Sequence, residues 1–322
     1  MKKTWKLALA ALTATLFNGA SSAEPAYPSH PVSIVVGFSA GGSTDMLART
    51  LAKELSGTFN QSFIVENKPG ANSNVAHTYV ARAKPDGYTL LMVPFGLAVN
   101  EYLYKGLRYK LDDFAPIALV AQVPNVLVVN KNLPFKTVKE FVDYSKAHPT
   151  EMTYGSPGIG SSLHLAGELF RYATGAEMLH VPFNGSGPAL IAVRSGEVKS
   201  AFDNLSTAAP MIKSGDLKAL AVTSDRRSDA FPDLPTVAES GYPQYEISSY
   251  FGLAAPAGTP PAIVDALNQA VMEALKAPSV QAQFKTLGAY AQVNTPAEFS
   301  AFLHKQNEKW RDVIKASGLQ PE

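Results

Sequence analysis

Two glycine-rich loops contain the residues of this chain whose types and spacing could do chemistry. The first spans residues 39–45 (SAGGSTD) and the second spans residues 155–162 (GSPGIGSS), and each leads from a strand pattern into a helical pattern. Glycines let backbone N–H groups approach a ligand, and the N-terminus of the following helix adds about half a positive charge. Further donors are the hydroxyls of Ser39, Ser43, Ser161 and Ser162. Each loop is therefore a candidate seat for a carboxylate or another oxyanion.

Each loop could also be a tight turn closed by a serine cap, which is the simpler interpretation of one such loop alone. The occurrence of two loops in one chain favours a ligand site. Neither loop has a phosphate motif, because GxxxxGK[ST] is absent and the glycines from Gly155 to Gly160 lack the GxGxxG spacing. Neither loop contains Lys or Arg, so neutral donors and helix ends would have to hold the anion.

Residues 37–41 (GFSAG) match the G-x-S-x-G nucleophile elbow of serine hydrolases. Asp203 and His304 would complete the order Ser, Asp, His, although no spacing selects them. The hydrolase fold needs earlier strands and an upstream oxyanion loop, whereas one short strand pattern precedes this motif. We therefore expect a protein without enzyme activity, and we keep an exported serine hydrolase that uses Ser39 as the alternative.

Two further polar residues lie at the ends of expected elements. Asp203 follows a strand pattern and precedes a helix, where α/β sheets bind ligands, but it could equally cap that helix. His164 lies in the first turn after the second loop, where it could donate to a ligand or pack in the core. The other histidines lack HxH or HExxH spacing, so we expect no metal and no cofactor.

Composition excludes several classes of protein. Of the 322 residues, 46% are hydrophobic and 17% are charged, which is typical of a globular protein rather than a disordered one. The net charge of +1 provides no basic surface for nucleic acid. Cysteine is absent, which removes disulfides, thiolate metal sites, catalytic cysteines and cysteine lipidation.

Residues 1–23 have the pattern of a secretory signal peptide. Lysines at positions 2, 3 and 6 precede an apolar stretch from Leu7 to Phe17, and small residues end at Ala23. The apolar stretch is too short for a stable membrane span. We therefore expect cleavage after Ala23 and a soluble periplasmic protein.

The elements that must position these loops alternate between strand and helix patterns. Strands are expected at residues 32–36, 63–65, 88–93, 116–129 (one or two segments, broken at Pro124), 152–155, 198–202 and 217–223. This alternation predicts an α/β fold in which helices flank parallel or mixed sheets. Two extended segments, near 118–124 and 246–253, are candidate crossings. We predict two lobes around a ligand cleft, with residues 24–122 plus 247–322 in lobe 1 and residues 123–246 in lobe 2.

The chain also resembles a known family over nearly its whole expected mature length. The resemblance is carried by FSAGGSTDMLAR (38–49), VENKPGAN (65–72), KPDGYTLLM (84–92), YGSPGIGSSLHLAGELF (154–170), HVPFNGSGPAL (180–190), FDNLSTAAP (202–210), LAVTSDRR (220–227), FPDLPTVAESGYP (231–243) and FGLAAPAGTP (251–260). These segments resemble the tripartite tricarboxylate transporter substrate-binding proteins, the Bug family of periplasmic solute receptors. The resemblance implies a type 2 periplasmic binding-protein fold, a Venus flytrap that closes on small carboxylates and delivers them to a membrane transporter.

The resemblance also implies which residues hold the ligand. They are Ser39, Gly41, Gly42 and Ser43 in the first loop, Asn74 at a common polar position, Ser156, Gly160, Ser161 and His164 around the second loop, and Asp203. After Gly70 the family usually continues with glycines, whereas this chain has residues 72–77 (NSNVAH), which leaves the pocket size open.

We therefore expect a monomeric receptor for a small organic acid. A dicarboxylate is favoured, because two helix ends suit two anionic ends, and a single neutral or aromatic acid stays open. Its partners would be the acid and the membrane components of a tripartite tricarboxylate transporter, with no nucleic acid.

Overall fold

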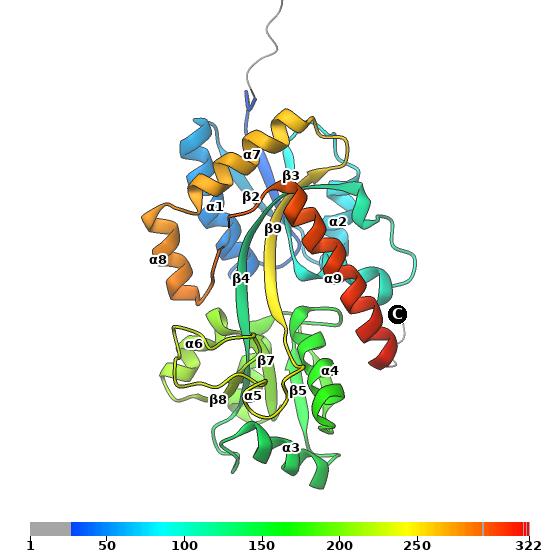
Figure 1. Cartoon of the computed structure of the whole chain (residues 1–322), viewed down its shortest axis with the longest axis vertical. Coiled ribbons are helices and arrows are strands. Elements are labelled where there is room, and N and C mark those ends of the chain that lie inside the picture. The colour runs from blue at the N-terminus through cyan, green and yellow to red at the C-terminus, as the bar shows by residue number, and fades with distance from the viewer. Residues whose placement is uncertain (1–26, 292, 318, 320, 322) are drawn as a thin grey trace, which may run out of the picture.

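The computed structural model describes residues 27–317 except residue 292, together with residues 319 and 321. The expected signal peptide, residues 1–23, lies outside the described residues, so its cleavage after Ala23 stays a prediction. Among the helices of the described part, none is long and apolar enough to cross a membrane. Figure 1 shows strands and helices arranged in two halves, joined by two long strands.

The upper half in Figure 1 is a mixed sheet with helices around it. Its strands are β1 (Val32–Val36), β2 (Phe63–Asn67), β3 (Thr89–Val93), β9 (Ser248–Pro256) and the first part of β4 (Phe114–Asn130). β1 is parallel to β2 and β3, whereas β9 is antiparallel to β3 and β4. The helical elements are α1 (Ser43–Phe59), α2 (Asn74–Ala81), α7 (Pro261–Ala274), α8 (Pro278–Leu287), α9 (Pro296–Ser317) and the short 3₁₀ turns η1 (Phe95–Ala98), η2 (Asn100–Tyr102) and η3 (Leu111–Asp113).

The lower half is a second mixed sheet. The second part of β4 is antiparallel to β7 (Ser200–Asn204) and β8 (Leu217–Val222). β5 (Thr153–Ser156) is parallel to β7 and to β6 (Leu179–Pro182). The helices of this half are α3 (Val138–Ala147), α4 (Ser162–Thr174), α5 (Ser186–Ser195) and α6 (Leu205–Lys213). In both sheets, short strands lead through loops into helices. Each glycine-rich loop is therefore held between a strand and a helix, as the sequence pattern predicted.

The long strand β4 connects the two halves and differs from the sequence expectation at Pro124. The sequence pattern predicted one or two extended segments broken at this proline, whereas β4 is one continuous strand. It pairs with β9 as far as Pro124 and with β7 and β8 from Asn125 onward. A proline has no N–H for the ladder, so it fits the point at which the partner strand changes. The lobe boundaries at 122/123 and 246/247 stay a prediction.

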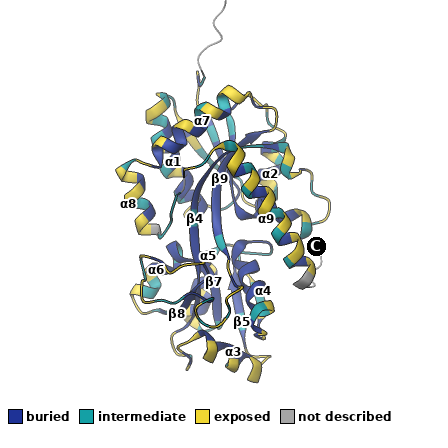
Figure 2. Ribbon diagram, in the orientation of Figure 1, coloured by how far each residue is buried: buried dark blue, intermediate teal, exposed yellow. Residues whose placement is uncertain are grey.

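Buried residues follow the strands and the inner faces of the helices, as Figure 2 shows. One apolar cluster packs α1 and α7 on β1, and another packs α5 and α6 on β4 and β8. The largest cluster runs through both halves and contains Tyr154 and Trp310, neither of which is exposed. Because this cluster is continuous, the two halves share a core on the side of α4 and α9.

Candidate functional site

A cleft with a volume of about 1330 Å³ lies between the two halves. Four helices begin at its walls: α1 from the upper half and α4, α5 and α6 from the lower half. The lining residues at these helix starts are Gly41, Gly42, Ser43 and Thr44; Ser161, Ser162 and Leu163; Gly185, Ser186 and Gly187; and Asn204, Ser206 and Thr207. The first-turn N–H groups of a helix lack partners within the helix, so four sets of backbone donors converge on one space.

The lining of the cleft is uncharged. Every lining residue is among the described ones, and none of them is Asp, Glu, Lys, Arg or His. The positive potential in the cleft therefore comes from helix ends and hydroxyl or amide dipoles rather than from cations. This matches the sequence argument that neutral donors would have to hold an anion.

Three of the four helix starts keep their backbone donors free of a side-chain cap. The N-cap residues of α1, α5 and α6 are Gly42, Gly185 and Asn204, and none of these makes a side-chain cap bond. In contrast, the N-cap of α4 is Ser161, whose hydroxyl accepts from the N–H of His164 at 3.1 Å. Donors for a ligand are thus most available at α1, α5 and α6.

The first loop is anchored from behind by Asp45. The Asp45 carboxylate accepts from the N–H of Gly41 and from the Arg49 guanidinium, both at 2.9 Å, and from Asn67 at 2.9 Å. Burial alone would raise the pKa of Asp45, but the hydrogen bonds from Arg49, Gly41 and Asn67 together bring it below its usual value. The ionised carboxylate fixes the loop, while Ser39 stays exposed at the cleft.

The second loop is held by the buried His164, whose ring lies beside the partly buried His180. The Nδ1 atom of His164 accepts from the N–H of Gly160 at 3.2 Å, and the ring lies 4.3 Å from that of His180. Burial lowers the pKa of His164 to about 4 and that of His180 to about 3, so both rings are neutral near pH 7. The hydroxyl of Ser156 lies 2.7 Å from Nε2 of His180. Ser156, Gly160 and His164 therefore shape the loop from behind the lining.

Ser161 has both of its hydrogen-bonding roles in use. Besides capping α4, its hydroxyl donates to the carbonyl of Gly158 at 2.7 Å. The sequence argument expected Ser161 to cap the helix and donate to a carboxylate. The cap is present, whereas its single proton points to Gly158, so a donation to a ligand would need that bond to be exchanged.

Asp203 lies at the end of β7, fully buried and behind the lining. Its Oδ1 accepts from the hydroxyl of Thr207, which lines the cleft, and its Oδ2 has no partner in the structure. Burial raises the pKa of Asp203 to about 6. The capping alternative is not realised, because the N-cap of α6 is Asn204.

The segment that departs from the usual glycines forms a turn at the cleft wall. Ala71, Asn72 and Ser73 all have positive φ, at 46°, 48° and 71°. The amide of Asn72 donates to Oδ1 of Asn100 at 2.8 Å, and Asn100 in turn donates to Oδ1 of Asn74 at 2.7 Å. Left-handed residues cost free energy unless their surroundings hold them, and this asparagine chain does so. Asn72 lines the cleft, whereas Asn74 lies within the network behind it.

Two of the hydrogen-bonded contacts between the halves lie beside the cleft and involve residues that line it. At one, the Ser43 hydroxyl lies 2.9 Å from that of Ser206 and accepts from the amide of Asn204 at 3.2 Å. At the other, Tyr104 donates to the carbonyl of Ile159 at 2.9 Å. Both pairs join an upper-half residue to a lower-half residue.

Of the ten residues expected to bind the ligand, the structure brings five to the cleft surface. These are Ser39, Gly41, Gly42, Ser43 and Ser161. Asn74, Ser156, Gly160, His164 and Asp203 support that surface from behind. Sequence reasoning missed the start of α5, although residues 185–188 (GSGP) form a third glycine- and serine-rich turn into a helix. The buried rings of Tyr250 and Phe251 also line the cleft.

The residues of the hydrolase alternative are not brought together. His304 lies on α9, where its Nε2 is 3.7 Å from the Asp112 carboxylate. Asp203 accepts from Thr207, as described above. A Ser-His-Asp triad needs each pair within hydrogen-bond reach, and Ser39 is paired with neither residue.

Two α/β halves around an uncharged cleft lined by helix starts define a solute receptor of the periplasmic binding-protein class. Residues 47–319 match the tripartite tricarboxylate transporter family receptor model, and the chain belongs to this family. The predicted fold class and the resemblance to Bug proteins are thereby confirmed. The family consists of solute receptors, which gives the hydrolase alternative no support.

Individual relatives are similar to this chain along nearly its whole length. Protein BugT of Bordetella pertussis is 37% identical over 297 residues, which is 91% of this chain and 91% of that protein. The solved structure of Rpa4515 of R. palustris with adipate has a TM-score of 0.88 at 37% identity and covers 92% of this chain and 100% of that one. MatC from Rhodopseudomonas palustris with bound malate has a TM-score of 0.84 at 33% identity, covering 89% and 100%.

Proposed function

We propose that this protein is a periplasmic receptor that captures a small organic acid, a dicarboxylate in the first instance, and delivers it to the membrane components of a tripartite tricarboxylate transporter. The observation that carries the proposal is the convergence of four helix starts on a cleft whose lining is uncharged. Such a site favours an anion through oriented backbone dipoles.

The absence of a cation from the cleft lining suits a receptor that must release its ligand. A buried Arg–carboxylate pair would be strong and bidentate, whereas each helix end contributes about 0.3–1 kcal/mol at an exposed site and somewhat more when partly buried. Contributions from both halves accumulate only when the cleft closes, so that closing and binding are coupled.

The relatives support the chemical class of the ligand. Rpa4515 was solved with adipate and MatC with malate, and both ligands are dicarboxylates. The similarity of this chain to both, over 89% or more of its length, carries the class to this protein as a proposal. Release from the signal peptide after Ala23 would place the receptor in the periplasm.

We assign the expected site residues to two roles. Ser39, Gly42 and Ser43 present donors to one carboxylate at the start of α1, where no side-chain cap competes. The starts of α5 and α6 serve the other end of the acid. Gly41, Asn74, Ser156, Gly160, Ser161, His164 and Asp203 hold the loops in position through the bonds described above.

Isothermal titration calorimetry with malate and adipate tests this proposal. We expect saturable binding, and ligand at 100 times Kd should add about 2.7 kcal/mol to the free energy of unfolding. Ser43→Ala should weaken binding, whereas Ser214→Ala, an exposed serine that donates to Met211 at the end of α6, should not. Binding of no small carboxylate would refute the proposal.

A separate assay tests the absence of enzyme activity. Hydrolysis of p-nitrophenyl acetate by the purified protein should not exceed background. Covalent labelling by a fluorophosphonate that disappears in Ser39→Ala would restore the hydrolase alternative, because it requires an activated serine.

A further inference from the structure

Apolar side chains enter the cleft from both halves. Phe38 and Met46 come from the upper half, and Phe183 and Met211 come from the lower half. Each packs against an apolar cluster of its own half, yet each remains partly exposed. The ring of Phe183 covers the backbone of Gly155, where an added Cβ would lie 3.3 Å from the ring. Partly exposed apolar groups in a concave site are the usual sign of an apolar part of a ligand.

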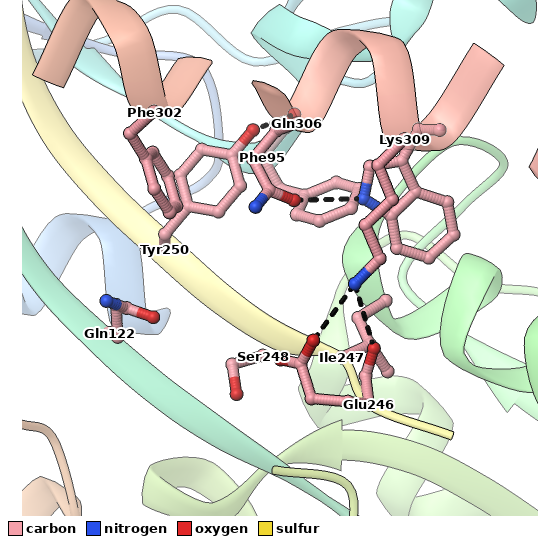
Figure 3. A pocket seen from close by; sticks show the side chains of 10 residues that line it. Phe95, Gln122, Glu246, Ile247, Ser248, Tyr250, Phe302, Gln306 and Lys309 are labelled. Atoms are coloured by element: carbon pink, nitrogen blue, oxygen red, sulfur yellow. Dashed lines mark hydrogen bonds and ion pairs between the residues drawn. The ribbon is translucent and has the colours of Figure 1, made fainter. Parts of the chain in front are cut away.

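The floor of the cleft is also apolar. Phe95, Tyr250 and Phe251 line it, and each is less than 5% exposed. The Tyr250 hydroxyl donates to the carbonyl of Phe95 at 3.2 Å, and the Tyr250 ring packs edge-on against Phe302. Figure 3 shows these three residues from a neighbouring pocket between β9 and α9, which they also line. The one polar atom of this ring is therefore used within the protein, so the floor offers aromatic surface rather than donors.

Most polar side chains between the helix starts are already paired with the protein. Asn72 donates to Asn100, and Tyr104 donates to Ile159. Ser162 lies 2.6 Å from the hydroxyl of Ser249. A ligand with hydroxyl groups along its body would lose water there and find few free partners, which costs about 1–3 kcal/mol for each unsatisfied group.

We infer that the acid has an apolar body, either a methylene chain or an aromatic ring, between or beside its carboxylates. This inference rests on the proposed function and deepens it. The helix starts of the two halves take the anionic ends, while Phe38, Met46, Phe183 and Met211 contact the body. The cleft volume of about 1330 Å³ exceeds the roughly 300–1,000 Å³ of sites for drug-sized ligands, so a ring or a six-carbon chain has room.

Adipate and galactarate form a matched pair of probes, because both are six-carbon dicarboxylates and they differ in four hydroxyl groups on the body. Isothermal titration calorimetry should give at least about tenfold tighter binding for adipate, the ratio expected for unmet hydroxyl partners. Terephthalate, with a ring between two carboxylates, should bind more tightly than citrate. Tighter binding of galactarate than of adipate, or of citrate than of terephthalate, would overturn the inference.

Phe183→Ala locates the effect in the cleft. We expect it to weaken adipate binding about five- to tenfold and to leave galactarate binding within twofold, because the lost contact is with the body of the acid. The control is Tyr172→Ala, an aromatic residue of the same half that is 66% exposed and lies outside the cleft lining. Equal weakening of both acids by Phe183→Ala would contradict the assigned role.

The outcomes separate this inference from the proposed function. If malate or citrate binds while adipate and terephthalate do not, the inference is wrong and the receptor proposal stands. If none of the probe acids binds to a folded protein, both are wrong. Thermal unfolding of each variant without ligand shows whether it remains folded.

Discussion

The two glycine-rich loops have similar sequences and begin helices at the same cleft, but they differ in which groups use their donors. In the first loop, the α1 start has glycine as its N-cap, and Ser39 is exposed. In the second loop, Ser161 caps α4, and the N–H of Gly160 is taken by His164. The comparison indicates that the first loop serves as a donor site, while the second is a wall held in shape by buried side chains.

The largest expected difference between the loops is their response to acid. Only the second loop depends on a neutral histidine, His164, whose folded-state pKa is about 4 against a usual 6.5. The unfolded chain therefore takes up this proton near pH 6.5, whereas the folded chain does so near pH 4. The contribution of neutral His164 to the free energy of unfolding is fully present above pH 6.5. It is lost as the pH falls toward 4, by about 3 kcal/mol in total.

Urea unfolding at several pH values measures this contribution. His164→Asn removes the titrating ring and keeps an acceptor near the position of Nδ1, so the slope of stability against pH between 6.5 and 4 should fall by up to about 1.4 kcal/mol per pH unit. The lowered pKa values of His77 and His180 change stability with pH in the same direction as that of His164, and the raised pKa of Asp203 changes it in the opposite direction. All three residues are present both in the natural chain and in the His164→Asn variant. An unchanged slope would show that His164 is not held neutral.

The second difference concerns the space around one glycine of each loop. Gly160 and Gly41 both have positive φ, at 78° and 90°. An added Cβ at Gly160 would lie 2.8 Å from Nδ2 of Asn72 in the upper half, whereas at Gly41 it would meet nothing within 4 Å. Gly160→Ala should therefore weaken carboxylate binding about 10- to 100-fold by overpacking where the halves meet.

Gly41→Ala is the matched control, because it carries the same kind of backbone strain without the contact. Both variants should lose about 1–2 kcal/mol of stability from the left-handed conformation. Calorimetric titration with malate or adipate then separates strain from overpacking. Comparable ligand affinities of the two variants would contradict the expected role of Gly160 in closing the cleft.

A third comparison uses one serine from each loop. Ser161→Ala removes the cap of α4 and should lower the free energy of unfolding by about 1 kcal/mol, with little loss of carboxylate affinity. Ser39→Ala should leave stability unchanged and weaken binding about three- to tenfold, the worth of one hydrogen bond. Chemical denaturation and calorimetry on both variants check the pair. The reverse pattern would exchange the roles of the two loops.

Local patterns were sufficient for much of the fold and for the existence of the two loops. The β-branched run of residues 32–36 forms strand β1, as expected. The strand β6 was not among the expected strands, because its four residues are too few to show a periodic pattern. Such elements are set by pairing and packing with distant parts of the chain.

The candidate site was harder to predict, because a side chain's role depends on partners that the sequence does not place. Ser161 and Gly160 look like donors in the sequence, but their groups are bonded to Gly158 and His164. No ligand role was expected for residues 185–188, and the fold places this helix start at the cleft. Asp203 precedes the helix N-cap by one residue, a distance within the usual error of predicted helix ends.

The smallest expected effect on ligand affinity is that of substitutions at Asp203. This residue lies in neither loop and supports the start of α6 from behind the cleft lining. It accepts from Thr207, and its folded-state pKa is raised to about 6 by burial. Asp203→Asn keeps the Oδ1 acceptor and the shape, so carboxylate affinity should change less than about twofold. Asp203→Ala removes the acceptor and frees the Thr207 hydroxyl, which should weaken binding about threefold or more.

The same pair of variants also reports on charge. A raised folded-state pKa means that the folded chain binds this proton more readily than the unfolded chain, so ionised Asp203 lowers stability as the pH rises from about 4 to 6. Asp203→Asn cannot ionise, and its stability relative to the natural chain should therefore increase across that interval. Calorimetry at pH 7 and urea unfolding at pH 4 and 7 measure both effects. A tenfold loss of affinity in Asp203→Asn would contradict the role of Asp203 as a simple acceptor for Thr207, because the variant keeps Oδ1 while it loses the charge and gains an NH2 group in place of Oδ2.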